Sequence, residues 1–142
     1  MTNFDPATFN QNLIEDLRTN GGRATSGPFQ GRDVLILTTR GARSGGLRES
    51  PLVYTRDGDR YLVAASKGGA DTHPDWYHNL VADPEVTVEV LGQKFAARAQ
   101  LYAEANDERR RLYDTHGMVS PAFKEYEAKT ARVIPMVALT RI

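Results

Sequence analysis

The sequence predicts a mainly β domain with helices, built on a small antiparallel barrel that is closed or partly closed. Two observations carry this prediction. Five or six short β-branched or alternating segments are separated by turn residues or a single helix, and a doubly wound parallel sheet would instead need a helix after most strands. Closure into a barrel removes the exposed edges that such short strands would otherwise leave.

Length and composition set the outer limits on the class of protein. The chain has 142 residues, with 18 Lys and Arg against 18 Asp and Glu, which fits a single domain spanning residues 1–142. Zero net charge argues against a general nucleic-acid binder. With no cysteine, thiolate metal sites and cysteine nucleophiles are excluded. No apolar stretch approaches the ~20 residues of a membrane span, so we expect a cytoplasmic protein.

An N-terminal helix is expected within residues 1–22. Asp5 is a suitable N-cap, Pro6 suits the first helical turn, and glycines at 21–22 end the pattern. The apolar residues on one 3.6-residue stripe are Phe9, Leu13, Ile14 and Leu17. We expect this stripe to pack over the barrel or over a bound cofactor.

The barrel and its remaining helices are expected within residues 33–142. The Asp57-Gly58 pair predicts a hairpin, and a turn at Gly92-Gln93 predicts another. The expected strands are 34–39, 50–55, 61–66, 86–90, 95–101 and 134–139, and the expected helices are 74–82, 104–117 and 121–130. The last two helices would cover the barrel from the C-terminal side.

The loop at residues 39–48 is basic and contains no acidic residue. It holds Arg40, Arg43 and Arg48 together with three glycines and the hydroxyl of Ser44. Glycines let backbone N–H groups converge on an anion, and guanidinium groups donate in pairs to phosphate or carboxylate oxygens. The pattern therefore indicates an anion-binding loop, with a solvated basic turn as the alternative.

A second glycine-containing loop follows the expected strand 61–66. Its residues Ser66, Lys67, Gly68 and Gly69 place a cation and flexible backbone at a strand end, where a ligand could approach closely. Neither loop has the order of a Walker motif or of a dinucleotide-binding fingerprint.

The helix expected at 74–82 carries Trp76 and Asn79 on one face. Trp76 could stack on a planar ring, with core packing as the alternative, while the Asn79 amide could read polar atoms of that ring. His73 and His78 are poorly spaced for a shared metal, and we expect no metal site. Without a nucleophile and base in a recognisable pattern, the sequence favours chemistry carried by a bound cofactor.

Four blocks in this order resemble the deazaflavin-dependent nitroreductase family. They are LTTRGARSG at 37–45, RESPLVY at 48–54, AASKGG at 64–69 and HPDWYHNL at 73–80. The resemblance implies a split β-barrel that binds coenzyme F420, an 8-hydroxy-5-deazaflavin with a phosphate and an oligoglutamate tail. Such a polyanion is the kind of ligand that the acid-free loop would suit.

The resemblance also implies a role for individual residues. The phosphate and tail would be held by Arg40, Arg43, Ser44 and Arg48, and the ring would lie along Pro51, Leu52 and Val53. Its other side would face Ser66, Lys67, Gly68 and Gly69, and the pocket would be completed by Trp76 and Asn79.

The activity implied is hydride transfer from reduced F420 to an electron-poor acceptor such as a quinone, an enone or a nitro compound. Ser66 and Tyr126 are the expected catalytic residues, as hydrogen-bond donors to the developing anion. The alternatives are a non-catalytic F420 carrier and, with less support, an FMN-binding split-barrel protein.

The resemblance further allows a monomer or a homodimer, and peripheral contact with a membrane through the N-terminal helix. That helix has Glu15 and Asp16 beside Arg18 and no basic face, so we expect at most weak membrane contact.

Overall fold

The computed structural model describes residues 6–119 and 121–142, so the expected cap Asp5 lies outside the described residues. Four α-helices, one short 3₁₀ helix and seven strands make up this part of the chain. In chain order they are α1 (Pro6–Thr19), β1 (Val34–Arg40), β2 (Leu47–Val53), β3 (Thr55–Asp57), β4 (Arg60–Ala64), η1 (Lys67–Gly69), α2 (Asp75–Ala82), β5 (Glu85–Val90), β6 (Gln93–Tyr102), α3 (Asp107–Val119), α4 (Ala122–Ala128) and β7 (Met136–Arg141).

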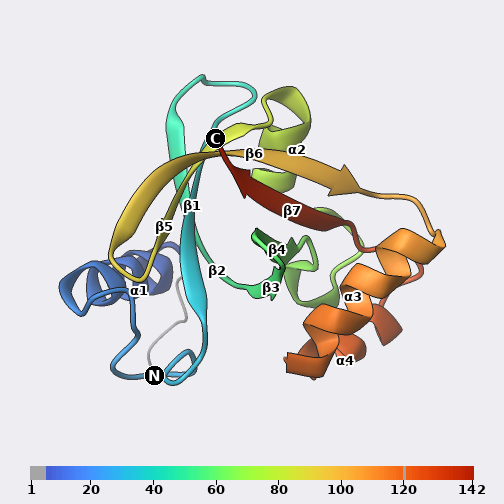
Figure 1. Ribbon diagram of the computed structural model, residues 1–142, viewed down its shortest axis with the longest axis horizontal. Coiled ribbons are helices and arrows are strands. Elements are labelled where there is room, and N and C mark those ends of the chain that lie inside the picture. Colours follow the sequence, from blue (N-terminus) through green and yellow to red (C-terminus); the bar gives the residue numbers. More distant parts are fainter. Residues whose placement is uncertain (1–5, 120) are drawn as a thin grey trace.

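All of these strands belong to one antiparallel sheet, in the order β2-β1-β5-β6-β7-β4-β3. The two edge strands, β2 and β3, follow each other in the chain with only Tyr54 between them. Because one residue joins the two edges, the sheet must curl until its ends approach. The result is the half-open barrel of Figure 1, which confirms the expected mainly β, split-barrel fold.

The structure corrects one expected strand. Residues 50–55 do not form a single strand paired with 61–66. The segment divides at Tyr54, where β2 pairs with β1 on one side and β3 pairs with β4 on the other. The Asp57-Gly58 hairpin is confirmed, since Asp57 is the register partner of Arg60.

The C-terminal strand lies inside the sheet, between β6 and β4. It begins at Met136, directly after Pro135, which lacks an N–H for the ladder. The Pro135 carbonyl accepts a hydrogen bond of 2.9 Å from the Ala65 N–H. The proline therefore stands just before the strand, where its missing donor disturbs no pairing.

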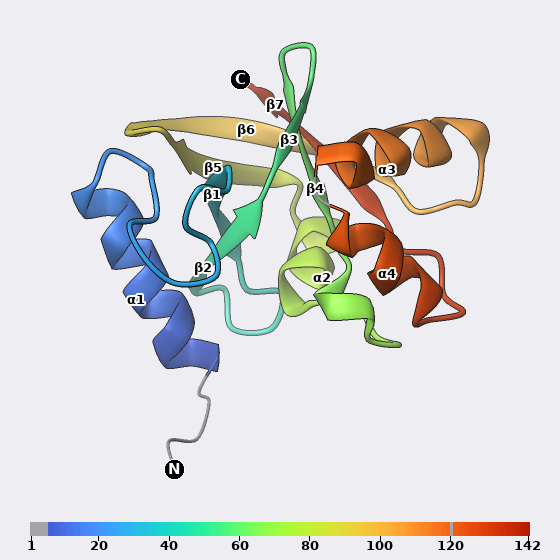
Figure 2. The ribbon, with the colours of Figure 1, turned by 90° about the horizontal axis from the view of Figure 1, so that it is seen from below.

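Helix α1 covers the β1–β2 side of the sheet (Figures 1 and 2). Its residues Leu13, Ile14 and Leu17 are buried against Val34 and Ile36 of β1. The expected apolar stripe is thus confirmed as a packing face on the barrel. In the described part of the chain, no helix combines the length and apolarity needed to cross a bilayer.

Helices α3 and α4 pack together on the other side of the sheet (Figure 1). Arg109, only 3% exposed, ties them to the start of β7: its Nε and Nη2 donate to the Ile134 carbonyl at 3.0 and 2.8 Å, and its Nη1 pairs with Glu127 at 3.0 Å. This guanidinium is a structural cross-link between α3, α4 and the last strand.

His116 of α3 is fully buried and neutral. Its Nδ1 lies 2.9 Å from Thr55 Oγ1, and its ring lies 4.2 Å from that of Phe123. Burial lowers the pKa of His116 from 6.5 to about 4, because a charged imidazolium is poorly solvated in an apolar core.

The buried His116 predicts an acid-sensitive fold. As pH falls below 6.5 the unfolded chain takes up a proton that folded His116 accepts only near pH 4, so stability falls through this window, by roughly 3 kcal/mol at most. Urea unfolding at pH 7.5 and 5.0 should show this loss in the wild type and a smaller loss in His116→Leu. Burial also lowers the pKa of His73. His73 therefore contributes the same pH dependence of stability to both proteins, and some loss remains in His116→Leu. Equal losses in the two proteins would contradict the assignment.

Candidate functional site

A cleft of about 1110 Å³ lies between α1, the loop joining β1 to β2, strand β2 and helix α2. Figure 1 shows the β1–β2 loop beside α2 at the top of the view and α1 beside the strands lower down. Because β2 is an edge of the sheet, part of its backbone has no strand partner and is open to a ligand. The predicted site residues that line the cleft are Arg43, Ser44, Arg48, Trp76 and Asn79.

The β1–β2 loop is a compact turn. The Gly41 N–H donates to the Gly46 carbonyl at 2.7 Å, and the Gly45 N–H donates to the Gly41 carbonyl at 2.9 Å. Ser44 Oγ accepts from the Gly46 N–H at 3.2 Å. A Cβ on Gly41 would come within 2.8 Å of Ser44 Oγ and 3.1 Å of the Gly46 carbonyl oxygen, so a larger residue here would displace the Ser44 hydroxyl and crowd the loop.

Asn79 holds this loop against α2. Its side chain is only 7% exposed, its Oδ1 accepts from the Ala42 N–H at 3.0 Å, and its Nδ2 donates to Thr39 Oγ1 at 3.1 Å. In the structure Asn79 shapes the loop, and its expected role in reading the ring stays a prediction.

Arg43 of the loop and Arg48 at the start of β2 are free to bind an anion. Within the described residues, neither Arg43 nor Arg48 has a carboxylate at ion-pair distance, whereas Arg40 donates from Nη1 to the Gly45 carbonyl at 3.1 Å. Arg43 and Arg48 thus present guanidinium donors to the cleft with no acidic partner to displace. This donor set fits a ligand that carries phosphate and carboxylate groups.

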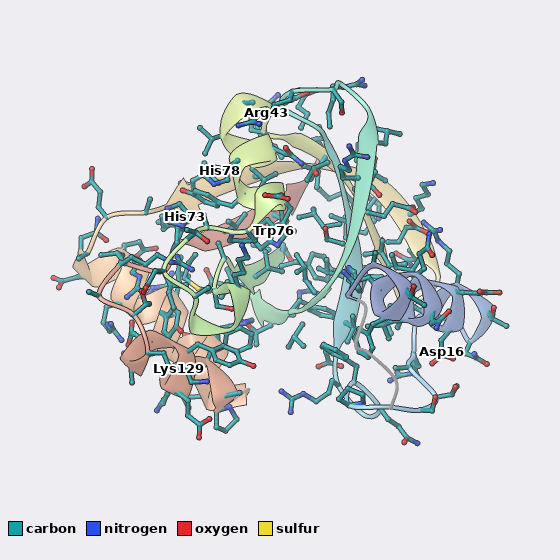
Figure 3. The ribbon with its side chains drawn as sticks, turned by 180° about the vertical axis from the view of Figure 1, so that it is seen from behind. Asp16, Arg43, His73, Trp76, His78 and Lys129 are labelled. Carbon is teal, nitrogen blue, oxygen red and sulfur yellow. The ribbon has the colours of Figure 1, made fainter. Side chains whose placement is uncertain are left out.

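Trp76 belongs to the barrel core and to the cleft at once. It is 7% exposed and packs in the same cluster as Leu35 and Leu80, yet it also lines the cleft. Figure 3 shows Arg43 near one end of α2 and Trp76 further along the same helix. The ring therefore forms an apolar part of the wall, next to the polar loop.

The remaining residues expected around the ring do not line this cleft. Pro51, Leu52 and Val53 are half-buried along β2, and Leu52 and Val53 pack against core clusters. Ser66 is 6% exposed and precedes η1, and Lys67 donates from Nζ to Thr72 Oγ1 at 3.3 Å. The structure thus places the predicted residues in the cleft, along β1 and β2, and in a further region around η1.

The η1 segment packs closely against α4, which carries Tyr126. A Cβ on Gly69 would lie 2.8 Å from the Tyr126 carbonyl oxygen, so only glycine allows the two backbones to approach. Lys67 has a φ of 47°, an uncommon conformation for a residue other than glycine, of the kind that clusters at functional sites. Ser66 and Tyr126, far apart in sequence, thereby belong to one region.

Arg132 is a supporting residue that the sequence analysis missed. Its guanidinium donates to three carbonyls around η1, those of Ala65, Ser66 and Ala70, at 3.2, 2.9 and 2.8 Å. Its Nη1 also lies 3.0 Å from His73 Nδ1. No local sequence signal marks Arg132, because its partners lie about 60 residues earlier in the chain.

Among residues 6–119 and 121–142, no group of three His, Cys, Asp or Glu residues is placed to hold a metal ion. The expected absence of a metal site stays a prediction.

A half-barrel sheet with an arginine-lined cleft at its edge strand defines a protein of the split β-barrel class. The model of the family described as F420H(2)-dependent quinone reductase matches residues 11–141, and the chain belongs to that family. It is 39% identical over 108 residues to the F420H(2)-dependent quinone reductase Rv1261c of Mycobacterium tuberculosis, covering 75% of this chain and 72% of the relative.

Two solved structures have the same fold. One, described as an F420-H2 dependent reductase, FDR-A, is 33% identical, with a TM-score of 0.68 over 76% of this chain and 94% of its own. The other, described as a domain-swapped dimer, is 28% identical, with a TM-score of 0.70 over 95% of this chain and 99% of its own.

The contact between η1 and α4 predicts a difference between two neighbouring glycines. Gly68 and Gly69 both have positive φ, 65° and 85°, but a Cβ on Gly68 meets nothing within 4 Å. Both alanine variants strain the backbone, and only Gly69→Ala also pushes on α4. Thermal unfolding should show a loss for Gly69→Ala that exceeds the loss for Gly68→Ala by roughly 1–3 kcal/mol. Equal losses would contradict the close packing of these two segments.

Proposed function

We propose that this protein reduces quinones by hydride transfer from F420H2 bound in the cleft beside β2. The chain is an oxidoreductase of the F420H(2)-dependent quinone reductase family, with F420 as its cofactor. The observation that carries the placement is the pair Arg43 and Arg48. Both line a cleft of about 1110 Å³ and have no acidic partner among the described residues.

Binding divides between two parts of the cleft. The guanidinium groups of Arg43 and Arg48 and the hydroxyl of Ser44 would hold the phosphate and the acidic tail. The edge of β2 and the face of Trp76 would accept the flat ring, since an aromatic wall favours stacking. The ring would then extend along Pro51, Leu52 and Val53 toward η1.

When bound, the reduced cofactor supplies a hydride. Reduction of a quinone also places negative charge on a carbonyl oxygen, which then takes a proton. Ser66 and Tyr126 are the proposed donors to that oxygen. Within the described residues, no hydrogen bond involves Ser66 Oγ or the Tyr126 hydroxyl, so both hydroxyls remain available to a substrate.

Family membership bears on the alternatives that the sequence left open. It favours an enzyme over a carrier and F420 over FMN, because the family is described by an F420H(2)-dependent reaction. Among quinones, enones and nitro compounds, it supports quinones as the acceptor.

A homodimer is the proposed assembly. Its support is the solved relative described as a domain-swapped dimer, which matches 95% of this chain. Light scattering coupled to gel filtration measures the assembly directly.

The loop assignment predicts a specific loss of affinity. Arg43→Ala should raise the F420 Kd about tenfold or more, because a charge-assisted hydrogen bond is worth about 1.5–3 kcal/mol. Adding Lys67→Ala should weaken binding further. Quenching of Trp76 fluorescence by F420 measures the Kd, with Arg98→Ala as a control outside the cleft, where Arg98 is exposed and pairs with Glu85. An unchanged Kd in the double variant would refute the assignment.

The donor assignment predicts an effect on turnover and not on binding. Ser66→Ala and Tyr126→Phe each remove one hydroxyl and leave the arginine loop intact. At least one should lower kcat for menadione by about 100-fold, the usual loss when a donor to a developing oxyanion is removed, with the F420 Kd within twofold of wild type. Wild-type kcat in both variants would exclude these residues as donors.

A further inference from the structure

Arg18, in the last turn of α1, bridges two acidic residues on neighbouring parts of the sheet. Its Nε and Nη2 donate to the two carboxylate oxygens of Glu89 on β5, at 3.0 and 2.7 Å. The same Nη2 also pairs with Glu49 on β2. Its hydrogen bonds to Glu89 and Glu49 raise the pKa of Arg18, so it stays a cation throughout the working pH range.

Glu49 occupies a sensitive position in the cleft. It follows Arg48 directly in β2, and both residues line the cleft. The titratable groups of the lining are Arg43, Arg48, Glu49, Asp75 and His78. The charges of the two arginines and the two carboxylates cancel. With His78 neutral, the lining therefore has no net positive charge of its own.

Arg18 changes this balance from outside the lining. By pairing with Glu49, it offsets a negative charge in the lining of the cleft that would otherwise repel an incoming anion. The adjacent Glu89 lies outside the cleft and holds the guanidinium in place through its two hydrogen bonds. A bidentate partner fixes the orientation of the arginine more firmly than a single contact would.

We propose that Arg18 is a positioning residue for cofactor binding: it offsets the charge of Glu49, so that this carboxylate does not repel the anionic part of a ligand held by Arg43 and Arg48. This rests on the proposed function of the cleft. Exposed ion pairs contribute little to stability, so the effect belongs to binding, where a like charge near an anion lowers affinity.

A four-variant titration tests this proposal. In Arg18→Gln, the uncovered Glu49 should raise the F420 Kd about five- to tenfold at low salt, and the effect should shrink at about 0.5 M salt as charges are screened. The double variant Arg18→Gln/Glu49→Gln should return the Kd to within twofold of wild type. Glu49→Gln alone should bind at least as tightly as wild type, and Glu89→Gln, which leaves the pair with Glu49, should bind as wild type does.

The double variant separates charge from structure. It lacks the Arg18 contact as completely as Arg18→Gln does, so a purely structural role in anchoring α1 predicts weak binding in both. Persistent weak binding in the double variant, or wild-type binding in Arg18→Gln, would overturn the proposal. Circular dichroism of each variant checks that α1 and the barrel are folded. If the wild type itself bound no F420 and reduced no quinone, the proposed function would fail, which is a different result from an unaltered Kd in Arg18→Gln.

Discussion

The arrangement of the cleft depends on the buried amide of Asn79. Its hydrogen bonds to the Ala42 N–H and to Thr39 Oγ1 join α2 to the β1–β2 loop. The loop carries Arg43, β2 carries Arg48 directly after it, and α2 carries Trp76. A single side chain therefore sets the distance between the anion-binding and the aromatic parts of the site. Buried donors and acceptors left without partners are costly, so this connection has one favoured geometry.

The sheet topology explains why a cleft exists beside β2. The sheet curls until its two edges are joined through Tyr54, but α1 and α2 flank β2 without sealing its edge. The opposite lobe, α3 and α4, is cross-linked by Arg109 and brings Tyr126 against η1. Long-range contacts thus gather two polar regions around one half-open barrel.

Much of the fold could be predicted from local sequence pattern. The apolar stripe of α1, the Asp57-Gly58 turn and the alternation of β5 and β6 each express a local preference. The division of β2 from β3 at Tyr54 could not be predicted, because strand pattern does not reveal which partner a residue pairs with. His116 was equally hidden, since nothing in its neighbours shows that the α3 face carrying it is buried.

Part of the candidate site could also be predicted. Glycines and arginines concentrated at 39–48 marked the loop, and the structure places Arg43, Ser44 and Arg48 in the cleft with Trp76 and Asn79. Arg18 and Arg132 carried no such mark, because their partners lie between 31 and 71 residues away.

The most direct test of F420 binding in the cleft is an amide NMR titration of labelled protein with F420. We expect the largest shifts at residues 41–46 and the Trp76 indole; shifts confined to another surface, with this loop unchanged, would contradict binding of F420 in the cleft.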